Sequence, residues 1–138
     1  MLEEGLVRYF YVIKDKEINS WFGFEKIILG SIMPLFYKLP SSENIQFLEN
    51  SIMYSIDNSD LNELYNKYND MNTIGRVMTE EYCKILEDRV ISLQTQSAED
   101  RYKNLLISQP DTLQRISLGH IASYLGINQE TLSRIRKK

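Results

Sequence analysis

The most chemically informative side chains of this sequence lie within its last ten residues, where polar and cationic types follow one another closely. Arg and Gln can form paired hydrogen bonds with purine edges, Glu can accept a hydrogen bond from cytosine, and Lys pairs with phosphate. These residue types at this spacing indicate a surface that reads double-stranded DNA. The candidate DNA-binding residues are Gln129, Glu130, Thr131, Ser133, Arg134, Lys137 and Lys138.

Two short helices are predicted to position these side chains. Ile121 and Leu125 are four residues apart, so they share one face of a first helix. Leu132 and Ile135 are three residues apart and give a second helix its apolar face. The candidate DNA-binding side chains then point away from that face. An ordinary helical hairpin with a solvated polar face is the alternative interpretation.

The residues at the junction of the two helices favour the DNA-binding interpretation. Ala122 is small enough to let the helices cross closely, and Gly126 can adopt the left-handed conformation that ends the first helix. Ile127 can fill the corner, and Asn128 can cap the second helix. These features, followed by a run of cations, are typical of a helix-turn-helix that places its second helix in the major groove.

Composition indicates a globular protein that folds without disulfides. The chain has 138 residues, of which 43% are hydrophobic and 25% are charged, the balance of a soluble domain. It has no apolar stretch of the about 18 residues that a membrane span needs, and no recognisable secretory signal. Cys83 is the single cysteine, and its apolar neighbours predict a thiol in the core. We therefore expect a cytoplasmic protein with no membrane contact.

Neither a metal site nor catalysis is expected. One histidine, His120, and one cysteine are too few to hold zinc or an iron–sulfur cluster. No motif pairs an acidic residue with a nucleophile or a metal, and His120 is expected to contact a phosphate or solvent. The sequence thus predicts a protein that is not an enzyme and that carries no cofactor.

Charge is distributed unevenly along the chain. The net charge is −3, yet from Ser97 onward seven Lys or Arg residues outnumber four Asp or Glu residues. The first 96 residues contain nine basic and fifteen acidic residues. A basic lobe on an acidic body suits a DNA-binding protein, because affinity for phosphate follows the local field.

The first third of the sequence has the pattern of short β-strands. Runs of β-branched and aromatic residues over positions 6–13 and 18–24 flank a polar tip and predict a hairpin. Glycines at positions 23 and 30 bracket another extended piece, and residues 33–42 suit a loop or one helical turn. Two further strands are predicted over residues 45–48 and 52–56.

The second part of the sequence is predicted to be helical. Asn58 or Ser59 can cap a first helix, and Ser97 with Asp100 forms a capping-box pattern for a later one. Between them, an apolar pattern that starts near Asp70 runs for about 25 residues, roughly 35 Å of helix. Its near-heptad spacing predicts pairing with a second copy, and a simple core helix is the alternative. The predicted dimer interface consists of Met71, Ile74, Met78, Tyr82, Ile85 and Leu86.

Two segments carry a family resemblance. They are Ser-Ala-Glu-Asp-Arg-Tyr-Lys-Asn-Leu-Leu at 97–106 and Ile-Ala-Ser-Tyr-Leu-Gly-Ile-Asn-Gln-Glu-Thr-Leu-Ser-Arg-Ile-Arg at 121–136. With the order of hairpins, long helix and helical pair, they resemble the Crp/Fnr family of bacterial transcription regulators, in wording closest to members from Bacteroidetes-type bacteria. The resemblance covers essentially the whole chain. It implies an α+β fold of three parts. Residues 1–69 form a partial β-roll related to cyclic-nucleotide-binding domains, residues 70–96 form a long dimerisation helix, and residues 97–138 form a winged-helix-like helix-turn-helix lobe.

The family reads DNA with an Arg-Glu-Thr-x-x-Arg pattern at the start of its recognition helix. The matching residues here are 129–134, so the resemblance implies that Glu130 accepts a hydrogen bond from cytosine and that Arg134 donates two to guanine. Gln129 stands where the family has arginine, which leaves the preferred base at that position open.

The resemblance also implies a sensor roll that is shortened in this sequence. The family's roll has several strands before the Gly-Leu-Val-Arg-Tyr segment, which lies here at 5–9. Either the reading frame or the sequence itself is shortened, or another chain completes the roll. Strand edges left open in this way are prone to swapping or aggregation.

The residues that hold cyclic nucleotides in the family are not matched here. Members that bind these ligands use a Gly-Glu pair for the ribose and an Arg-Ser/Thr pair for the phosphate. The corresponding positions are Gly30-Ser31 and Ser41-Ser42. Since a buried cyclic phosphate without a cation would be poorly held, we expect no response to cyclic AMP.

The function expected from the sequence is therefore that of a homodimeric, sequence-specific DNA-binding regulator. Its expected partners are a near-palindromic DNA site, a second copy of the chain and RNA polymerase. The effector, the operator, and the choice between activation and repression are left open. The alternative is a ligand-responsive β-roll module with weak or lost DNA binding, in which Trp21, Phe22, Phe24 and Phe36 line an apolar pocket.

Overall fold

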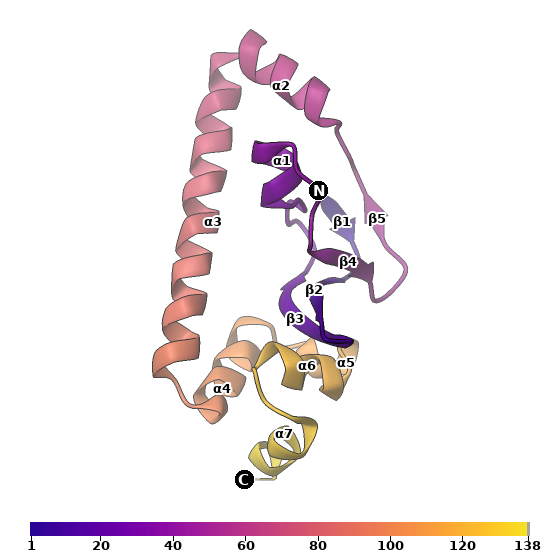
Figure 1. The fold of residues 1–138 in the computed structure, drawn as a ribbon, viewed down its shortest axis with the longest axis vertical. Helices are drawn as coiled ribbons and strands as arrows, with labels where there is room; N and C mark the ends of the chain where they lie inside the picture. The colour runs from indigo at the N-terminus through magenta and orange to yellow at the C-terminus, as the bar shows by residue number, and fades with distance from the viewer. Residues whose placement is uncertain (138) are drawn as a thin grey trace. The chain divides into compact units, whose positions relative to one another are not determined.

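β-branched and aromatic residues near the start of the chain form a three-stranded antiparallel sheet in the order β3-β2-β4. In this computed structural model, which describes residues 1–137, β2 spans Val7–Ile13, β3 spans Lys16–Gly23 and β4 spans Asn44–Phe47 (Figure 1). The two residues between β2 and β3, Lys14 and Asp15, have φ angles of 49° and 61°. Such left-handed residues suit a two-residue hairpin turn, and the predicted hairpin is confirmed.

A second, smaller sheet pairs β1 (Leu2–Glu4) with β5 (Ile52–Met53) in antiparallel fashion. The strand predicted over residues 52–56 is thus limited to two residues. No strand forms between residues 23 and 30, contrary to expectation, because that segment turns at Lys26, where φ is 65°. The helical turn predicted within 33–42 is present as α1 (Ile32–Tyr37).

Six further helices follow, so the fold is mixed α+β with small antiparallel sheets. They are α2 (Asn58–Lys67), α3 (Asn69–Thr95), α4 (Ala98–Ser108), α5 (Thr112–Arg115), α6 (Leu118–Tyr124) and α7 (Gln129–Arg136). The predicted cap of α2 is wrong by one or two residues. The cap is Asp57, because the backbone N–H of Leu61 already donates to the carbonyl of Asp57. In the described part of the chain, no helix has the length and apolar character needed to cross a membrane.

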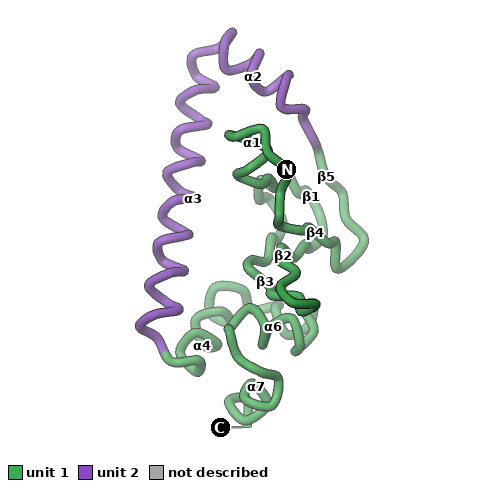
Figure 2. Tube along the Cα trace, in the orientation of Figure 1, with its two compact units in different colours: residues 1–54, 97–138 green, residues 55–96 purple. Residues whose placement is uncertain are grey.

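The chain divides into two compact units (Figure 2). Residues 1–54 and 97–138 belong to the first unit, and residues 55–96 belong to the second. The division into 1–69, 70–96 and 97–138 stays a prediction.

The larger of two hydrophobic clusters joins the sheet of the first unit to its helices. Leu6 and Phe22 come from the sheet region and pack in the same buried cluster as the helical residues. A second cluster on the sheet gathers Trp21, Ile27 and Leu29 around three buried residues. The helical members of the first cluster are Tyr102, Leu105, Ile116, Ile121, Ala122, Leu125 and Leu132.

The second unit consists of α2 packed against the start of α3. A Cβ added to Gly75 would lie 2.7 Å from the hydroxyl oxygen of Tyr65, so the small residue permits this close approach. Asn72 Nδ2 donates to the carbonyl of Tyr65 at 2.6 Å and fastens the same corner. Burial of Cys83 was predicted, and the prediction is wrong for this chain: the thiol is exposed.

Candidate nucleic-acid interface

The α6 helix begins and ends where its local sequence predicts. The hydroxyl of Ser117 accepts a hydrogen bond from the N–H of His120 at 3.3 Å and so caps the first turn. Ile121 and Leu125 are completely buried, as expected of the apolar face of α6. Ala122 is 2% exposed and lies in the same core.

A left-handed glycine sets the turn between α6 and α7. Gly126 has a φ of 70°, and its N–H donates to the carbonyl of Ser123 at 3.1 Å. The next N–H, of Ile127, reaches back to the carbonyl of Ala122 at 3.0 Å. This pair of bonds is the Schellman arrangement, which satisfies the last carbonyls of α6 and fixes the exit direction of the chain.

Asn128 then starts α7. Its side-chain Oδ1 accepts a hydrogen bond from the N–H of Thr131 at 2.8 Å, which confirms the predicted cap. Leu132 is buried and Ile135 is half-buried against the same core. Because a helix has about 3.6 residues per turn, these two contacts fix which side of α7 faces outward.

Most of the candidate DNA-binding residues lie on that outward side. Glu130, Ser133, Arg134 and Lys137 are exposed and adjacent on the helix surface, and Gln129 is exposed at its edge. Thr131 is half-buried, so it is the least accessible of the set. Lys138 lies outside the described residues.

Two cations that the sequence pattern did not single out contribute to the α6–α7 pair. Arg136 is exposed in the last turn of α7 beside Lys137. Arg101, on α4, donates from Nη2 to the carbonyl of Leu125 at 2.9 Å, which places a positive charge at the carboxyl end of α6. No local pattern could have predicted this second contact, because 24 residues separate its partners.

A buried polar network holds α6 against the hairpin of β2 and β3. Arg8 is 4% exposed, and its Nη1 donates to Asn19 Oδ1 at 3.0 Å. Asn19 in turn donates from Nδ2 to the carbonyl of His120 at 3.0 Å, and its backbone N–H donates to Ser123 Oγ at 2.9 Å. Glu17 Oε2 accepts from the Nη2 of Arg8 and balances its charge. These hydrogen bonds attach α6 to the sheet through His120 and Ser123. The α6 helix lies between β3 and α7 (Figure 1).

His120 is half-buried and takes part in this network. Its expected contact with a phosphate stays a prediction. Its Nδ1 lies 3.3 Å from the Nη1 of Arg8. Since arginine can only donate, this contact requires an unprotonated Nδ1. Partial burial and the Arg8 cation both lower the pKa of His120 from its ordinary value, and the nearby Glu17 carboxylate only partly offsets them.

A second set of charges fastens α5 to the loops of the sheet. Arg115 donates to the carboxylates of both Glu25 and Glu49, and its guanidinium lies 5.7 Å from the centroid of the Phe24 ring. The hydrogen bonds from Arg115 lower the pKa of Glu25 to about 2, against a smaller opposing effect of burial. The same two carboxylates raise the pKa of Arg115. These pairs keep the basic charge of Arg115 occupied within the fold.

The two positions that match the family's cyclic-nucleotide residues lie side by side. Ser31 Oγ and Ser41 Oγ are 2.9 Å apart and share a hydrogen bond. Ser41 Oγ also donates to the carbonyl of Glu43, whose own carboxylate accepts from Ser20 Oγ at 3.0 Å. Ser41 therefore contacts the backbone of Glu43, and the Glu43 carboxylate contacts Ser20. Ser42 and Gly30 are exposed.

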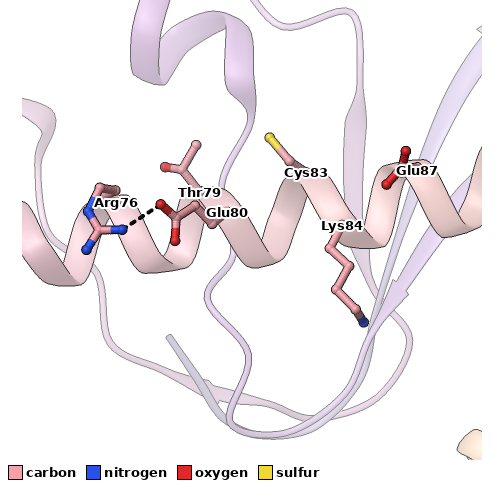
Figure 3. A pocket seen from close by; sticks show the side chains of 6 residues that line it. All are labelled: Arg76, Thr79, Glu80, Cys83, Lys84 and Glu87. Carbon is pink, nitrogen blue, oxygen red and sulfur yellow. Dashed lines mark hydrogen bonds and ion pairs between the residues drawn. The ribbon is translucent and has the colours of Figure 1, made fainter.

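The apolar and polar faces of α3 are distinct. Ile74, Met78, Tyr82 and Leu86 are exposed along one side of the helix, while Met71 and Ile85 are half-buried. On the opposite side lies an open hollow of about 700 Å³. Figure 3 shows the side chains that line it and the ion pair between Arg76 and Glu80, whose Nη1 and Oε1 are 2.6 Å apart. This hollow is lined by Arg76, Thr79, Glu80, Cys83, Lys84 and Glu87.

Comparison with known proteins gives no relative for this chain: no family model and no curated protein matches it. Within residues 1–137, no group of three or more His, Cys, Asp or Glu side chains is arranged to hold a metal ion.

Proposed function

We propose that this protein is a sequence-specific DNA-binding transcriptional regulator of the Crp/Fnr type, in which α6 and α7 form the helix-turn-helix. The observation that carries the proposal is the exposed polar face of α7. Glu130, Ser133, Arg134 and Lys137 are adjacent on a helix whose position is fixed by a capped start, a left-handed glycine and a buried apolar face. Such a helix can enter the major groove without rearrangement.

The contacts of α6 support the same role. His120 and Ser123 bind the sheet, whereas Gly119 lies close to Gln129 of α7, with 3.8 Å between its Cβ position and Gln129 Oε1. Both the sheet and α7 thus contact α6. The hairpin supports the helical pair and leaves the DNA-facing side chains exposed.

Homodimerisation through α3 is the second part of the proposal. Large apolar side chains rarely remain exposed as a continuous stripe unless a partner covers them. Ile74, Met78, Tyr82 and Leu86 recur every four residues along one side of a 27-residue helix. Pairing of two copies would present two α7 helices to a near-palindromic site about one DNA turn apart, roughly 34 Å.

We further propose that cyclic AMP is not the effector. The hydroxyls of Ser31 and Ser41 bind each other, and Ser41 also donates to the backbone carbonyl of Glu43. These hydroxyls offer no cation to pair with a phosphate, and a buried phosphate charge without such a partner is poorly held. Calorimetric titration of the purified chain with cyclic AMP is expected to give no saturable heat, and submillimolar binding would contradict this part of the proposal.

Selection of bound sequences from a random DNA library tests the main proposal. We expect recovery of an inverted repeat whose half-sites are separated by about one helical turn. Recovery of no enriched sequence at low salt would refute sequence-specific binding.

Two substitutions on the selected DNA separate base reading from phosphate binding. Arg134→Ala should cost about 1–3 kcal/mol and relax the preference at one base position. Lys137→Ala should weaken binding to all sequences alike and reduce the salt dependence by about one unit of slope. Arg76→Ala removes an equally exposed arginine from the other unit and is the matched control. An Arg134→Ala protein with unchanged affinity and preference would show that α7 does not read bases.

A further inference from the structure

A hollow beside β3 in the first unit has the composition of a small-molecule site. It has a volume of about 200 Å³ and lies where the end of β3 meets the carboxyl ends of α4 and α6. Its lining consists of Trp21, Phe22, Phe24, Leu105, Ser108, Gln109 and Tyr124. These residues come from sequence positions more than 100 apart, so the hollow exists only in the folded unit.

The lining favours a flat aromatic ring. Four of the seven side chains are aromatic, and the rings of Phe22 and Tyr124 are 5.2 Å apart at an interplanar angle of 51°. Aromatic rings accept another ring in offset or edge-on contact at such separations. An apolar cavity of about 150 Å³ is enough to bind benzene. A volume of 200 Å³ therefore admits a single ring or a small fused pair.

The polar groups of the hollow favour a ligand that is neutral and that donates a hydrogen bond. Ser108 Oγ already donates to the carbonyl of Leu105 at 3.1 Å, so it offers only its acceptor lone pairs. The amide of Gln109 adds a further acceptor oxygen at the carboxyl end of α4, where the helix dipole favours a donor from the ligand. The lining also contains donors in the Gln109 amide, the Trp21 indole and the Tyr124 hydroxyl, so the acceptor-only Ser108 Oγ is what favours a donating ligand. None of the lining residues is charged, so a buried ligand charge would find no partner here.

From these observations we propose that this hollow binds a small, neutral, planar heteroaromatic compound with a ring N–H, of which indole is the simplest example. The ring lies among Trp21, Phe22, Phe24 and Tyr124, and its N–H donates to Ser108 Oγ or to the side-chain oxygen of Gln109. The proposal does not depend on DNA binding. The site is distinct from the serines at 31 and 41, where the family resemblance places cyclic nucleotides.

Trp21 makes the proposal directly measurable, because it is the single tryptophan of the chain. Its indole Nε1–H gives one resolved signal in the ¹H–¹⁵N spectrum of the labelled protein. Titration with unlabelled indole is expected to shift this signal and the side-chain amide signal of Gln109 in a saturable way. Benzofuran has the shape of indole without the N–H donor and is expected to bind about fivefold more weakly, the effect of one hydrogen bond.

Two variants locate the binding. Ser108→Leu fills the hollow and should weaken indole binding at least tenfold. Gln109→Ala enlarges the hollow, and it tests the site if Ser108→Leu does not fold. In Gln109→Ala, loss of one acceptor should reduce the difference between indole and benzofuran. Phe36→Ala removes an exposed aromatic ring of α1 outside the hollow and is the matched control with unchanged binding.

The outcomes divide cleanly. Saturable shifts at Trp21 and Gln109 that Ser108→Leu abolishes support the site, and weaker binding of benzofuran supports the ligand class. Shifts that do not saturate at the solubility limit of indole, or that are not weakened in a folded Ser108→Leu variant, overturn the site. An unchanged difference between indole and benzofuran in Gln109→Ala also counts against it. Equal binding of indole and benzofuran overturns the assigned ligand class.

Discussion

Arg8 and His120 form an unusual pair for the interior of a small unit, since both can carry a positive charge. Arg8 stays charged at all ordinary pH values and has Glu17 as its counter-ion. Neutral His120 can accept from Arg8, but protonated His120 can only repel it. The network therefore makes the attachment of α6 to the hairpin sensitive to pH.

The folding stability of the chain is expected to fall as the pH drops below about 6.5, the ordinary pKa of histidine. Burial and Arg8 lower the pKa of His120 in the folded state, so the unfolded chain binds the proton more readily. This contribution to stability is fully present above the unfolded-state pKa and is lost as the pH falls through the lowered folded-state pKa. Urea unfolding at pH 8 and pH 5.5 measures the difference, and His120→Gln should remove most of it. An identical pH dependence in His120→Gln would contradict the assignment.

Glu25 gives a separate signature at acid pH. Its pKa of about 2 in the folded state lies below its ordinary value of 4.5, so it stabilises the fold above pH 4.5 and the contribution disappears as the pH falls towards 2. Because the pair with Arg115 is partly exposed, Glu25→Gln should cost about 1 kcal/mol at most at pH 7. Between pH 4.5 and pH 2, the free energy of unfolding of the variant should also decrease less than that of the parent chain. Glu63→Gln, on exposed α2, is the control and should behave as the parent chain.

The caps and turns of this chain could be predicted from local sequence patterns, whereas the contacts between its elements could not. Gly126, Asn128 and the Ser97–Asp100 capping box lie where the sequence predicts them, because each depends on neighbours within four residues. The hydrogen bonds from Asn19 to α6 join residues about 100 positions apart, so no local spacing in the sequence could predict them.

The candidate site was accessible to prediction for the same reason. The outward face of α7 follows from the burial of Leu132 and Ile135, which lie on the same helix as the candidate DNA-binding residues. Burial of Cys83 was predicted from its apolar neighbours, and it failed because Cys83 lies on the polar face of α3. The half-burial of Thr131 also depends on contacts that the sequence does not state.

The turn between α6 and α7 should tolerate no side chain at its glycine. Gly126→Ala places a Cβ on a residue with a φ of 70° and should destabilise the first unit by about 1 kcal/mol. Since the same residue sets the direction of α7, DNA affinity should fall as well. Gly30→Ala is the matched control, because its Cβ would meet no atom within 4 Å. Thermal unfolding of both variants tests this, and equal melting temperatures would show that the left-handed turn is not required.

At the scale of the whole molecule, function depends on whether the exposed stripe of α3 is covered by a second copy. Ile74, Met78, Tyr82 and Leu86 are large apolar side chains of the second unit, and all four are exposed. A stripe of this kind is stabilising only when it is removed from water, at about 25 cal/mol per Å² of apolar surface. The dimer would also supply the spacing of two α7 helices that an inverted repeat requires.

If α3 forms the proposed dimer, Met78→Glu should give a monomer, because it would place two carboxylates in the proposed apolar interface. Ile91→Glu makes the same change of residue type on the opposite side of α3, where Ile91 is also exposed, and should leave the dimer intact. Light scattering coupled to gel filtration measures the mass of each variant. The monomer should bind a single half-site weakly and lose the steep preference for the full repeat. If Met78→Glu stays dimeric while binding DNA normally, the stripe on α3 is not the dimer interface, and the two α7 helices must be paired by another surface.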